Sequence, residues 1–261
     1  MMLDLTASSV DLTRAICDIP SVSGDEKTLA DAIEEAISVY SHLEVIRHGN
    51  TIVARTNLGR AQRVAIAGHI DTVPINGNVP TKDLEIDGVA HLWGRGTVDM
   101  KSGTAVQLKL AAELTEPTVD ITWMWYDNEE VEASKNGLAL LAAVRPDLFR
   151  ADFAILGEPS SGEVEGGCNG TMRAIVRTTG VRAHAARAWI GENAIHRAAP
   201  ILARLAEYRA KEIAVDGLLY RESMSAVRIT GGVAGNVIPD ACEVEVNYRC
   251  LLYTSDAADE E

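Results

Sequence analysis

The sequence lacks paired cysteines. Its four cysteines, Cys17, Cys168, Cys242 and Cys250, are scattered along 261 residues, and no two of them form a CxxC pair. This arrangement argues against a disulfide framework and against a zinc site built from thiolates, and it fits a reducing compartment. We therefore expect a cytoplasmic protein.

Basic residues and long hydrophobic runs are also scarce. The chain has 24 Lys and Arg against 38 Asp and Glu, so its formal net charge is -14. A protein that binds a phosphate backbone needs a charge of the opposite sign. No apolar run reaches the 18 residues of a membrane span, and the N-terminus has no basic segment followed by an apolar stretch, as a signal peptide would. We expect neither nucleic acid nor a membrane as a partner.

The end of the chain differs in character from the sequence before it. Residues 241–249 alternate like a strand, and the alternation stops in CLLYTSDAADEE, residues 250–261. The codons of a common transposon-end sequencing adapter translate to Cys-Leu-Leu-Tyr-Thr-Ser, which matches Cys250 to Ser255. We interpret 250–261 as a non-native, adapter-derived tail rather than a natural acidic tail, and we expect the native protein to continue beyond Arg249.

The first part of the chain alternates between helical and strand patterns. Helices are expected over 9–18, 26–40, 102–115 and 136–144, and strands over 43–47, 51–56, 62–68, 119–126 and 152–156. Ser23 and Glu26 fit a capping box at the start of the second helix. This order predicts an α/β fold with helices on the faces of a sheet.

From residue 171 the pattern changes to strand, helix, strand and strand. The strands are expected over 171–180, 224–230 and 241–249, and the helix over 192–211. The spacing predicts that the helix turns one face inward, formed by Ile195, Ala199, Leu202 and Leu205. Pro200 is expected to kink or break the helix. We expect a small α+β module, inserted into or appended to the first domain.

Four polar loops follow apolar segments or glycine-rich turns. They are GHID (His69, Asp71), GRGTVDMKSG (Asp99), YDNEE (Asp127, Glu129, Glu130) and LGEP (Glu158). Each motif alone is weak, because adjacent glutamates are usually solvated and GEP is usually a turn. Since functional groups collect past the carboxyl ends of strands in open α/β sheets, all four together predict one site at one sheet edge.

Carboxylates gathered in a cleft repel one another, and a divalent cation removes that repulsion. One imidazole with several carboxylate oxygens suits zinc, and cobalt or manganese is tolerated. Two cations bridged by one aspartate, about 3.5–4 Å apart, would polarise a carbonyl. Of two adjacent glutamates, one can bind metal while the other takes a proton from water. Asp71 is expected to accept the second N–H of His69 and so to fix its tautomer.

The set GHIDTVP, GRGTVDMKSG, NEE and GEP resembles the di-zinc aminoacylase and acetylornithine deacetylase family of amidohydrolases and peptidases. The resemblance covers residues 10–249. It implies a zinc-peptidase-like catalytic domain with a mixed sheet over residues 1–170. It also implies an inserted α+β lid or dimerisation domain over residues 171–249. Both domains are expected to be incomplete at the C-terminus.

The resemblance assigns a role to each matching residue of the first domain. His69 and Glu158 would bind one zinc, and Asp99 would bridge to a second zinc that Glu130 binds. Glu129 would act as general base and then as general acid to the leaving amine.

The resemblance also assigns roles in the second domain. His184 resembles a histidine that reaches across a dimer to stabilise the tetrahedral oxyanion. Asn236 in GNVIPD resembles a substrate-contacting asparagine, and Arg249 resembles an arginine that holds a succinyl carboxylate.

The function implied by this resemblance is amide hydrolysis with two zinc ions per subunit, or cobalt in their place. The implied substrate is a small-molecule N-succinyl amino acid of lysine and diaminopimelate biosynthesis, and the implied assembly is a homodimer. The alternatives are a sister N-acyl amino acid deacetylase of the acetylornithine type, a metallodipeptidase or, in another class, a non-catalytic metal-binding or interaction fragment.

The sequence departs from the family pattern in one respect. The family has a further histidine ligand on its second zinc near the C-terminus, and this sequence has none there. The other histidines are expected to be surface residues or neighbours of the site rather than ligands: His42, His48, His91 and His196. We therefore expect the fragment as given to be inactive.

Overall fold

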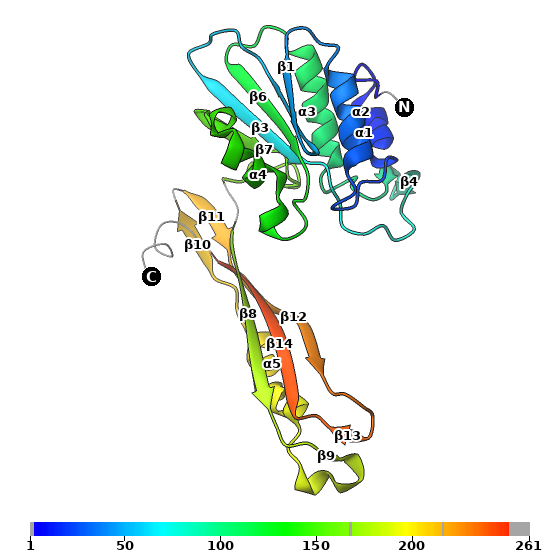
Figure 1. Ribbon diagram of the computed structural model, residues 1–261, viewed down its shortest axis with the longest axis vertical. Helices are drawn as coiled ribbons and strands as arrows, with labels where there is room; N and C mark the ends of the chain where they lie inside the picture. Colours follow the sequence, from blue (N-terminus) through cyan, green and yellow to red (C-terminus); the bar gives the residue numbers. More distant parts are fainter. Residues whose placement is uncertain (1–2, 167–168, 216, 251–261) are drawn as a thin grey trace. The chain divides into compact units, whose positions relative to one another are not determined.

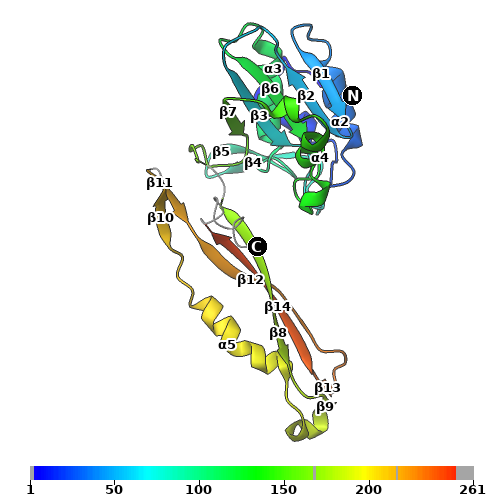
Figure 2. The same cartoon turned by 60° about the vertical axis from the view of Figure 1, so that its left-hand side comes forward.

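The computed structural model describes residues 3–166, 169–215 and 217–250. The chain divides into two compact units, Met1–Gly162 (unit 1) and Glu163–Glu261 (unit 2), each of which is described by itself (Figure 1 and Figure 2). Of the predicted tail 250–261, only Cys250 lies within the described residues, as the last residue of a strand.

Unit 1 contains most of the elements that the sequence predicts, with ends that differ by a few residues. In chain order they are α1 (Ser9–Cys17), α2 (Lys27–Ile37), β1 (Glu44–His48), β2 (Thr51–Arg55), β3 (Arg63–His69), β4 (Lys82–Ile86), β5 (Val89–Trp93), α3 (Lys101–Glu113), β6 (Asp120–Tyr126), η1 (Ala133–Lys135), α4 (Gly137–Val144), η2 (Pro146–Phe149) and β7 (Phe153–Leu156). The α/β prediction is confirmed.

The central sheet of unit 1 has five strands in the order β1-β2-β6-β3-β7. Strand β3 runs parallel to β6 and β7, whereas β1–β2 and β2–β6 are antiparallel, so the sheet is mixed as predicted. His69 lies opposite Tyr126, and Ala67 lies opposite Leu156. The carboxyl ends of β3, β6 and β7 therefore meet at one edge of the sheet.

Helices cover both faces of this sheet. One face packs against α1, α2 and α3 in a core that includes Ile33, Leu108, Trp123 and Trp125 (Figure 1). A smaller core, which includes Met124, Tyr126, Leu141 and Leu148, lies on the other face. Residues of β6 thus alternate between two cores, which explains why this strand is apolar without interruption.

The predicted capping box at the start of α2 is wrong. Glu26 occupies the N-cap position but makes no side-chain cap hydrogen bond, and its Oε1 accepts instead from the backbone N–H of Gly24 at 2.6 Å. Ser23 donates its hydroxyl to Oδ2 of Asp71 at 2.7 Å. The serine hydroxyl, which the local pattern had assigned to the helix cap, therefore binds the carboxylate of Asp71, 48 residues away in the sequence.

Strands β4 and β5 form a hairpin that the sequence analysis did not predict. Asp87 and Gly88 connect them with positive φ angles of 53° and 77°, the conformation of a tight hairpin turn. Asp-Gly between apolar residues was the available signal. The hairpin lies between the loops that carry His69 and Asp99 in the sequence.

Unit 2 has the predicted order of strand, helix and two strands, with five short additions. Its elements are β8 (Gly170–Thr179), β9 (Ala183–His184), η3 (Ala185–Ile190), α5 (Ala194–Ala206), β10 (Glu212–Val215), β11 (Leu218–Arg221), β12 (Ser223–Gly231), β13 (Val237–Ile238) and β14 (Ala241–Cys250). The main sheet is antiparallel, in the order β12-β14-β8. Pairs β9–β13 and β10–β11 form two further small sheets.

Helix α5 packs on the main sheet of unit 2, but its inner face differs from the prediction in its first half. Ala194 and Ala198 are fully buried against Cys242 and Val244, in place of the predicted Ile195 and Ala199. The N–H of Ala194 donates to the carbonyl of Pro239 at 2.9 Å, so this contact sets the rotation of the helix.

Leu202 and Leu205 pack against the same core of unit 2, as predicted. Pro200 lies within α5, which continues to Ala206, so the predicted break does not occur.

None of the helices in the described ranges is both long enough and apolar enough to cross a membrane.

The packing of α3 predicts the effect of a cavity in the core of unit 1. Replacing Leu108, which is fully buried, with alanine should lower the free energy of unfolding by about 2–5 kcal/mol, because the hole cannot be refilled. The measurement is urea denaturation followed by the fluorescence of the buried Trp123 and Trp125. Val106→Ala, on the exposed side of the same helix, is the control, and equal losses in the two variants would contradict this packing.

Candidate metal centre

Three polar groups extend from the carboxyl edge of the sheet in unit 1. His69 is the last residue of β3, and the loop after β6 carries Glu129 and Glu130. Glu158 follows β7 by two residues. Because these three strands are parallel, their loops leave the sheet side by side. The convergence that the sequence predicts for these residues is thus built into the strand order.

His69 is almost fully buried, with 1% of its surface exposed. Its Nε2 lies 3.0 Å from Oδ1 of Asp99 and 3.9 Å from Oε1 of Glu158. Its Nδ1 lies 3.0 Å from the carbonyl oxygen of Asp71 and 3.4 Å from Oδ1 of the same residue. The main-chain carbonyl of Asp71 is thus the nearer partner of this nitrogen, and the carboxylate, the partner expected from the sequence, lies slightly farther away.

The Asp71 carboxylate also organises the loop after β6. It is fully buried and accepts from the backbone N–H groups of Glu129, at 3.0 Å, and Glu130, at 3.1 Å. It also accepts from the hydroxyl of Ser23. One anionic side chain thereby holds two other acidic residues in place through their main chain.

Asp99 reaches the site from the loop before α3, and half of its side chain is exposed. The peptide bond between Asp99 and Met100 is cis. The Asp99 carboxylate borders solvent on one side and His69 on the other. This position would allow it to contact both a buried and an exposed part of the site.

Two sets of three side chains are close enough to hold a cation. His69, Asp99 and Glu158 form one set, and His69, Glu129 and Glu130 form the other. In each set, one ligand atom per residue lies within 4.8 Å of the others. A shell with metal–ligand bonds of about 2.2 Å spans at most about 4.4 Å. Asp99, the predicted bridge, and Glu130, the predicted ligand of the second zinc, belong to different sets.

The electrostatics of the site reflect an excess of negative charge. Burial raises the pKa of Glu158, and Asp99, Glu129 and Glu130 raise it further against the opposing effect of His69. Burial and Asp99 raise the pKa of Glu130 in the same way. Protonation is one way to relieve such crowding, and a bound cation is another.

The two residues at the end of β3 respond in opposite directions. Burial alone would lower the pKa of His69, but the hydrogen bond to Asp71 and the charges of Glu158, Asp71 and Asp99 raise it to about 9. Burial alone would raise the pKa of Asp71, but hydrogen bonds from His69, Ser23 and the two backbone amides lower it. Both shifts favour a positive charge at the position of His69.

The donor atoms fit a divalent cation. A buried imidazole nitrogen and several carboxylate oxygens are ligands that zinc accepts, with cobalt and manganese as chemical alternatives. Asp127, although in the same loop, accepts from Thr51 and Asn128 and belongs to neither set.

The predicted site residues of unit 2 fall into two places. His184 pairs with Val237 across β9 and β13, and the N–H of Ala185 donates to the carbonyl of Asn236 at 2.8 Å. The structure therefore brings His184 and Asn236 together at one end of the unit. Nδ1 of His184 accepts from the N–H of Ala186.

Arg249 lies at the other end of the main sheet of unit 2. It pairs with Thr171 on β8, and its guanidinium donates to the hydroxyl of that residue at 2.6 Å. From Ala241, the first residue of β14, eight strand residues at about 3.4 Å each place it roughly 27 Å away. Arg249 therefore cannot contact the same small molecule as His184 of the same copy.

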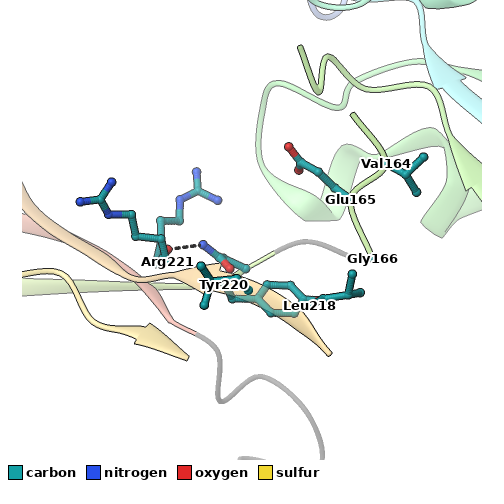
Figure 3. A pocket seen from close by; sticks show the side chains of 9 residues that line it. Val164, Glu165, Gly166, Leu218, Tyr220 and Arg221 are labelled. Atoms are coloured by element: carbon teal, nitrogen blue, oxygen red, sulfur yellow. Dashed lines mark hydrogen bonds between the residues drawn. The ribbon is translucent and has the colours of Figure 1, made fainter. Parts of the chain in front are cut away.

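A cavity of about 630 Å³ lies beside Arg249. Its walls come from β11 and its turn, and from the segment before β8 (Figure 3). Arg221 also lines it, and the carbonyl of Arg221 accepts from Asn169 at 2.9 Å. Two guanidinium groups next to one cavity suit an anionic ligand.

Sequence reasoning missed Ser23 as part of the site. Its contact with Asp71 joins residues 48 positions apart, and the motif SGDE gave only a local helix-cap signal. Among the described residues, neither set includes His42, His48, His91 or His196.

Comparisons with known proteins support a family assignment. The model of peptidase family M20/M25/M40 matches residues 65–251. A Mycobacterium tuberculosis protein provisionally named succinyl-diaminopimelate desuccinylase DapE is 52% identical over 98% of this chain and 72% of its own length. The succinyl-diaminopimelate desuccinylase of Corynebacterium glutamicum is 47% identical over 95% of this chain and 67% of its own length.

Solved structures share the fold. A tripeptidase from Staphylococcus aureus aligns with a TM-score of 0.65 at 21% identity, over 96% of this chain and 67% of that one. A dinuclear metal-binding peptidase of the M20 family from Bacillus subtilis aligns with a TM-score of 0.56 at 16% identity, over 96% and 65%. At these identities the likeness concerns architecture alone.

The hydrogen bonds of Asp71 predict the effect of changing its carboxylate to an amide. In Asp71→Asn, the new NH2 group would face a backbone donor, so the free energy of unfolding should fall by about 1–3 kcal/mol. Urea denaturation measures this loss. Asp127→Asn is the matched control, because its partners Thr51 and Asn128 can reorient their side chains. A loss in the control as large as in Asp71→Asn would contradict the anchoring role.

Proposed function

The chain belongs to peptidase family M20/M25/M40, and we propose that it is the member that releases succinate from N-succinyl-LL-2,6-diaminopimelate. The observation that carries an amide-hydrolase assignment is the convergence of His69, Asp99 and Glu158 within one cation-sized cluster. The substrate assignment rests on two relatives, 52% and 47% identical, whose names state succinyl-diaminopimelate desuccinylase. The reaction belongs to lysine and diaminopimelate biosynthesis.

We propose two zinc ions per subunit, with cobalt as a functional substitute. His69, Asp99 and Glu158 would hold one ion, and Glu130, with Asp99 as the bridge, would contribute to the second. When bound, such ions supply Lewis acidity that polarises a carbonyl and acidifies a water molecule. The buried position of His69 and the half-exposed position of Asp99 support this division, since the second ion then lies nearer to solvent.

Glu129 is proposed as the general base and, later, the general acid. Its N–H is held by Asp71, which fixes the start of its side chain at the edge of the site. A glutamate anchored by its main chain can turn its carboxylate toward an attacking water and then toward a leaving amine. Removing the water proton and returning it to the amine nitrogen keeps the reaction balanced.

Unit 1 is proposed as the catalytic domain and unit 2 as the lid and dimerisation domain. His184 would stabilise the oxyanion, Asn236 would contact substrate, and Arg249 would hold the succinyl carboxylate with its planar fork. The separation of Arg249 from His184 and Asn236 within one copy of unit 2 supports a homodimer, because a second copy must then supply the missing end.

A cytoplasmic location remains a prediction. It rests on cysteine usage, and Cys17 and Cys242 are free and buried.

The substrate proposal is tested with a panel of amides. We expect turnover of N-succinyl-LL-2,6-diaminopimelate to exceed that of N-acetylornithine and of dipeptides, because Arg249 favours an acyl group with a distal carboxylate. Release of the free amine is measured for this chain and for the protein encoded by the uninterrupted genomic reading frame.

Each result of the panel selects one assignment. Preference for N-acetylornithine would indicate a sister deacetylase, and preference for dipeptides a metallodipeptidase. No turnover by either protein, with cations bound, would favour a non-catalytic metal-binding protein. Arg249→Lys keeps the charge but loses the fork, so its KM should rise for the succinyl substrate and not for N-acetylornithine.

The role of Glu129 predicts a separation of turnover from metal content. In the protein from the uninterrupted frame, Glu129→Gln should lower kcat by about 10²–10⁴-fold, the usual contribution of general acid–base catalysis. Elemental analysis should still find the wild-type amount of metal. Glu132→Gln is the control, because this residue of the same loop is exposed and its carboxylate forms a surface ion pair with Lys135. Full activity of Glu129→Gln would refute the assignment.

A further inference from the structure

We propose that Met100 and Thr104 are positioning residues that hold His69 at the spacing from Asp99 and Glu158 that a shared cation requires. The inference rests on the proposed metal centre and extends it to the helix that follows Asp99. Neither side chain supplies a ligand atom in the proposed sets. Both act on the main chain of His69.

Met100 connects two proposed ligands directly. It follows Asp99 in the sequence, and its side chain is fully buried. Its sulfur accepts from the backbone N–H of His69 at 3.2 Å. A thioether is a weak acceptor, but here it receives a buried N–H at the end of β3. One residue therefore joins the loop of Asp99 to the strand of His69.

The methyl group of Met100 reaches a third part of the site. A Cβ atom added at Gly68 would lie 2.5 Å from Cε of Met100, one at Gly157 would lie 2.9 Å away, and one at Gly103 would lie 3.0 Å away. Gly68 precedes His69, and Gly157 precedes Glu158. The methyl group thus fits among three glycines, two of which are the chain neighbours of proposed ligands.

Thr104 holds the other polar group of the His69 main chain. It is fully buried, and its hydroxyl donates to the carbonyl of His69 at 3.2 Å. One turn further along α3, Gln107 donates to the carbonyl of Ala67 at 3.0 Å. Positions 100, 104 and 107 share one face of a helix. Side chains on this face of the helix therefore form hydrogen bonds with the main chain at the end of β3, at His69 and Ala67.

Metal binding is sensitive to small displacements of the ligands. A functional constellation must be held within about 0.5 Å of its productive geometry, and the spacing of the proposed ligands depends on how α3 meets β3 and the loop after β7. Side chains that orient metal ligands commonly change metal affinity by about 10–100-fold when they are replaced. Met100 and Thr104 meet this description through the backbone of His69.

The experiment compares metal affinity in matched variants of this chain. Met100→Leu removes the sulfur acceptor at similar volume, and Met124→Leu makes the same change at a buried methionine of the smaller core of unit 1. Affinity for zinc is measured by competition with a chromophoric chelator, and the geometry of the site by the visible absorption spectrum of added cobalt. Met100→Leu should weaken zinc binding by about 10–100-fold and alter the cobalt spectrum, whereas Met124→Leu should leave both close to wild type.

A second pair of variants applies the same test at Thr104. Thr104→Val removes the hydroxyl at the same shape and should weaken zinc binding, whereas Thr104→Ser keeps the donor and should restore it. This pair decides the question if Met100→Leu does not fold, which loss of the buried-tryptophan fluorescence would show. A purely structural role would lower the stability of the metal-free chain without changing the zinc affinity or the cobalt spectrum.

Two results would overturn the inference, and they are distinguishable. Wild-type affinity and spectra in both Met100→Leu and Thr104→Val would refute the positioning role while leaving the metal centre intact. A wild-type chain that binds neither zinc nor cobalt would refute the proposed metal centre, and this inference with it.

Discussion

The buried carboxylate of Asp71 is the group on which the geometry of the candidate site depends. It joins the end of β3 to the loop after β6 by accepting two backbone amides and one hydroxyl. The remaining negative charges, on Asp99, Glu129, Glu130 and Glu158, can then be held near His69 without direct contact between their carboxylates. Hydrogen bonds to Asp71 offset its own burial, so this anion is stable where its neighbours need a counter-charge.

Much of this arrangement can be predicted from sequence because parallel strands impose it. Once β3, β6 and β7 are recognised as buried strands, the polar residues after each must meet at one edge, which is why His69, Glu130 and Glu158 could be chosen. Contacts between residues far apart in the sequence could not be found in this way where neither residue lies in a recognisable helix or strand pattern. Ser23 was assigned to a local cap because nothing in SGDE reveals a partner 48 residues away.

Other differences have equally local causes. The inner face of α5 is shifted by one residue in its first half. A backbone hydrogen bond from Ala194 to Pro239 holds the start of the helix in a rotation that side-chain hydrophobicity alone does not predict. The hairpin of β4 and β5 is exposed along most of its length, so its residues lack the alternation by which buried strands are recognised. Its Asp-Gly turn was the one informative signal.

The proposed ligands are spread from His69 to Glu158, and this spread has a consequence for biosynthesis. At translation rates of about 5–20 residues per second, roughly 4–18 seconds separate the appearance of His69 from that of Glu158. During this interval the nascent chain presents a histidine and carboxylates whose partners have not yet been made. A cation can thus be bound only late in synthesis. Its binding stabilises only those chains whose parallel strands have already paired, because strand pairing brings the proposed ligands together.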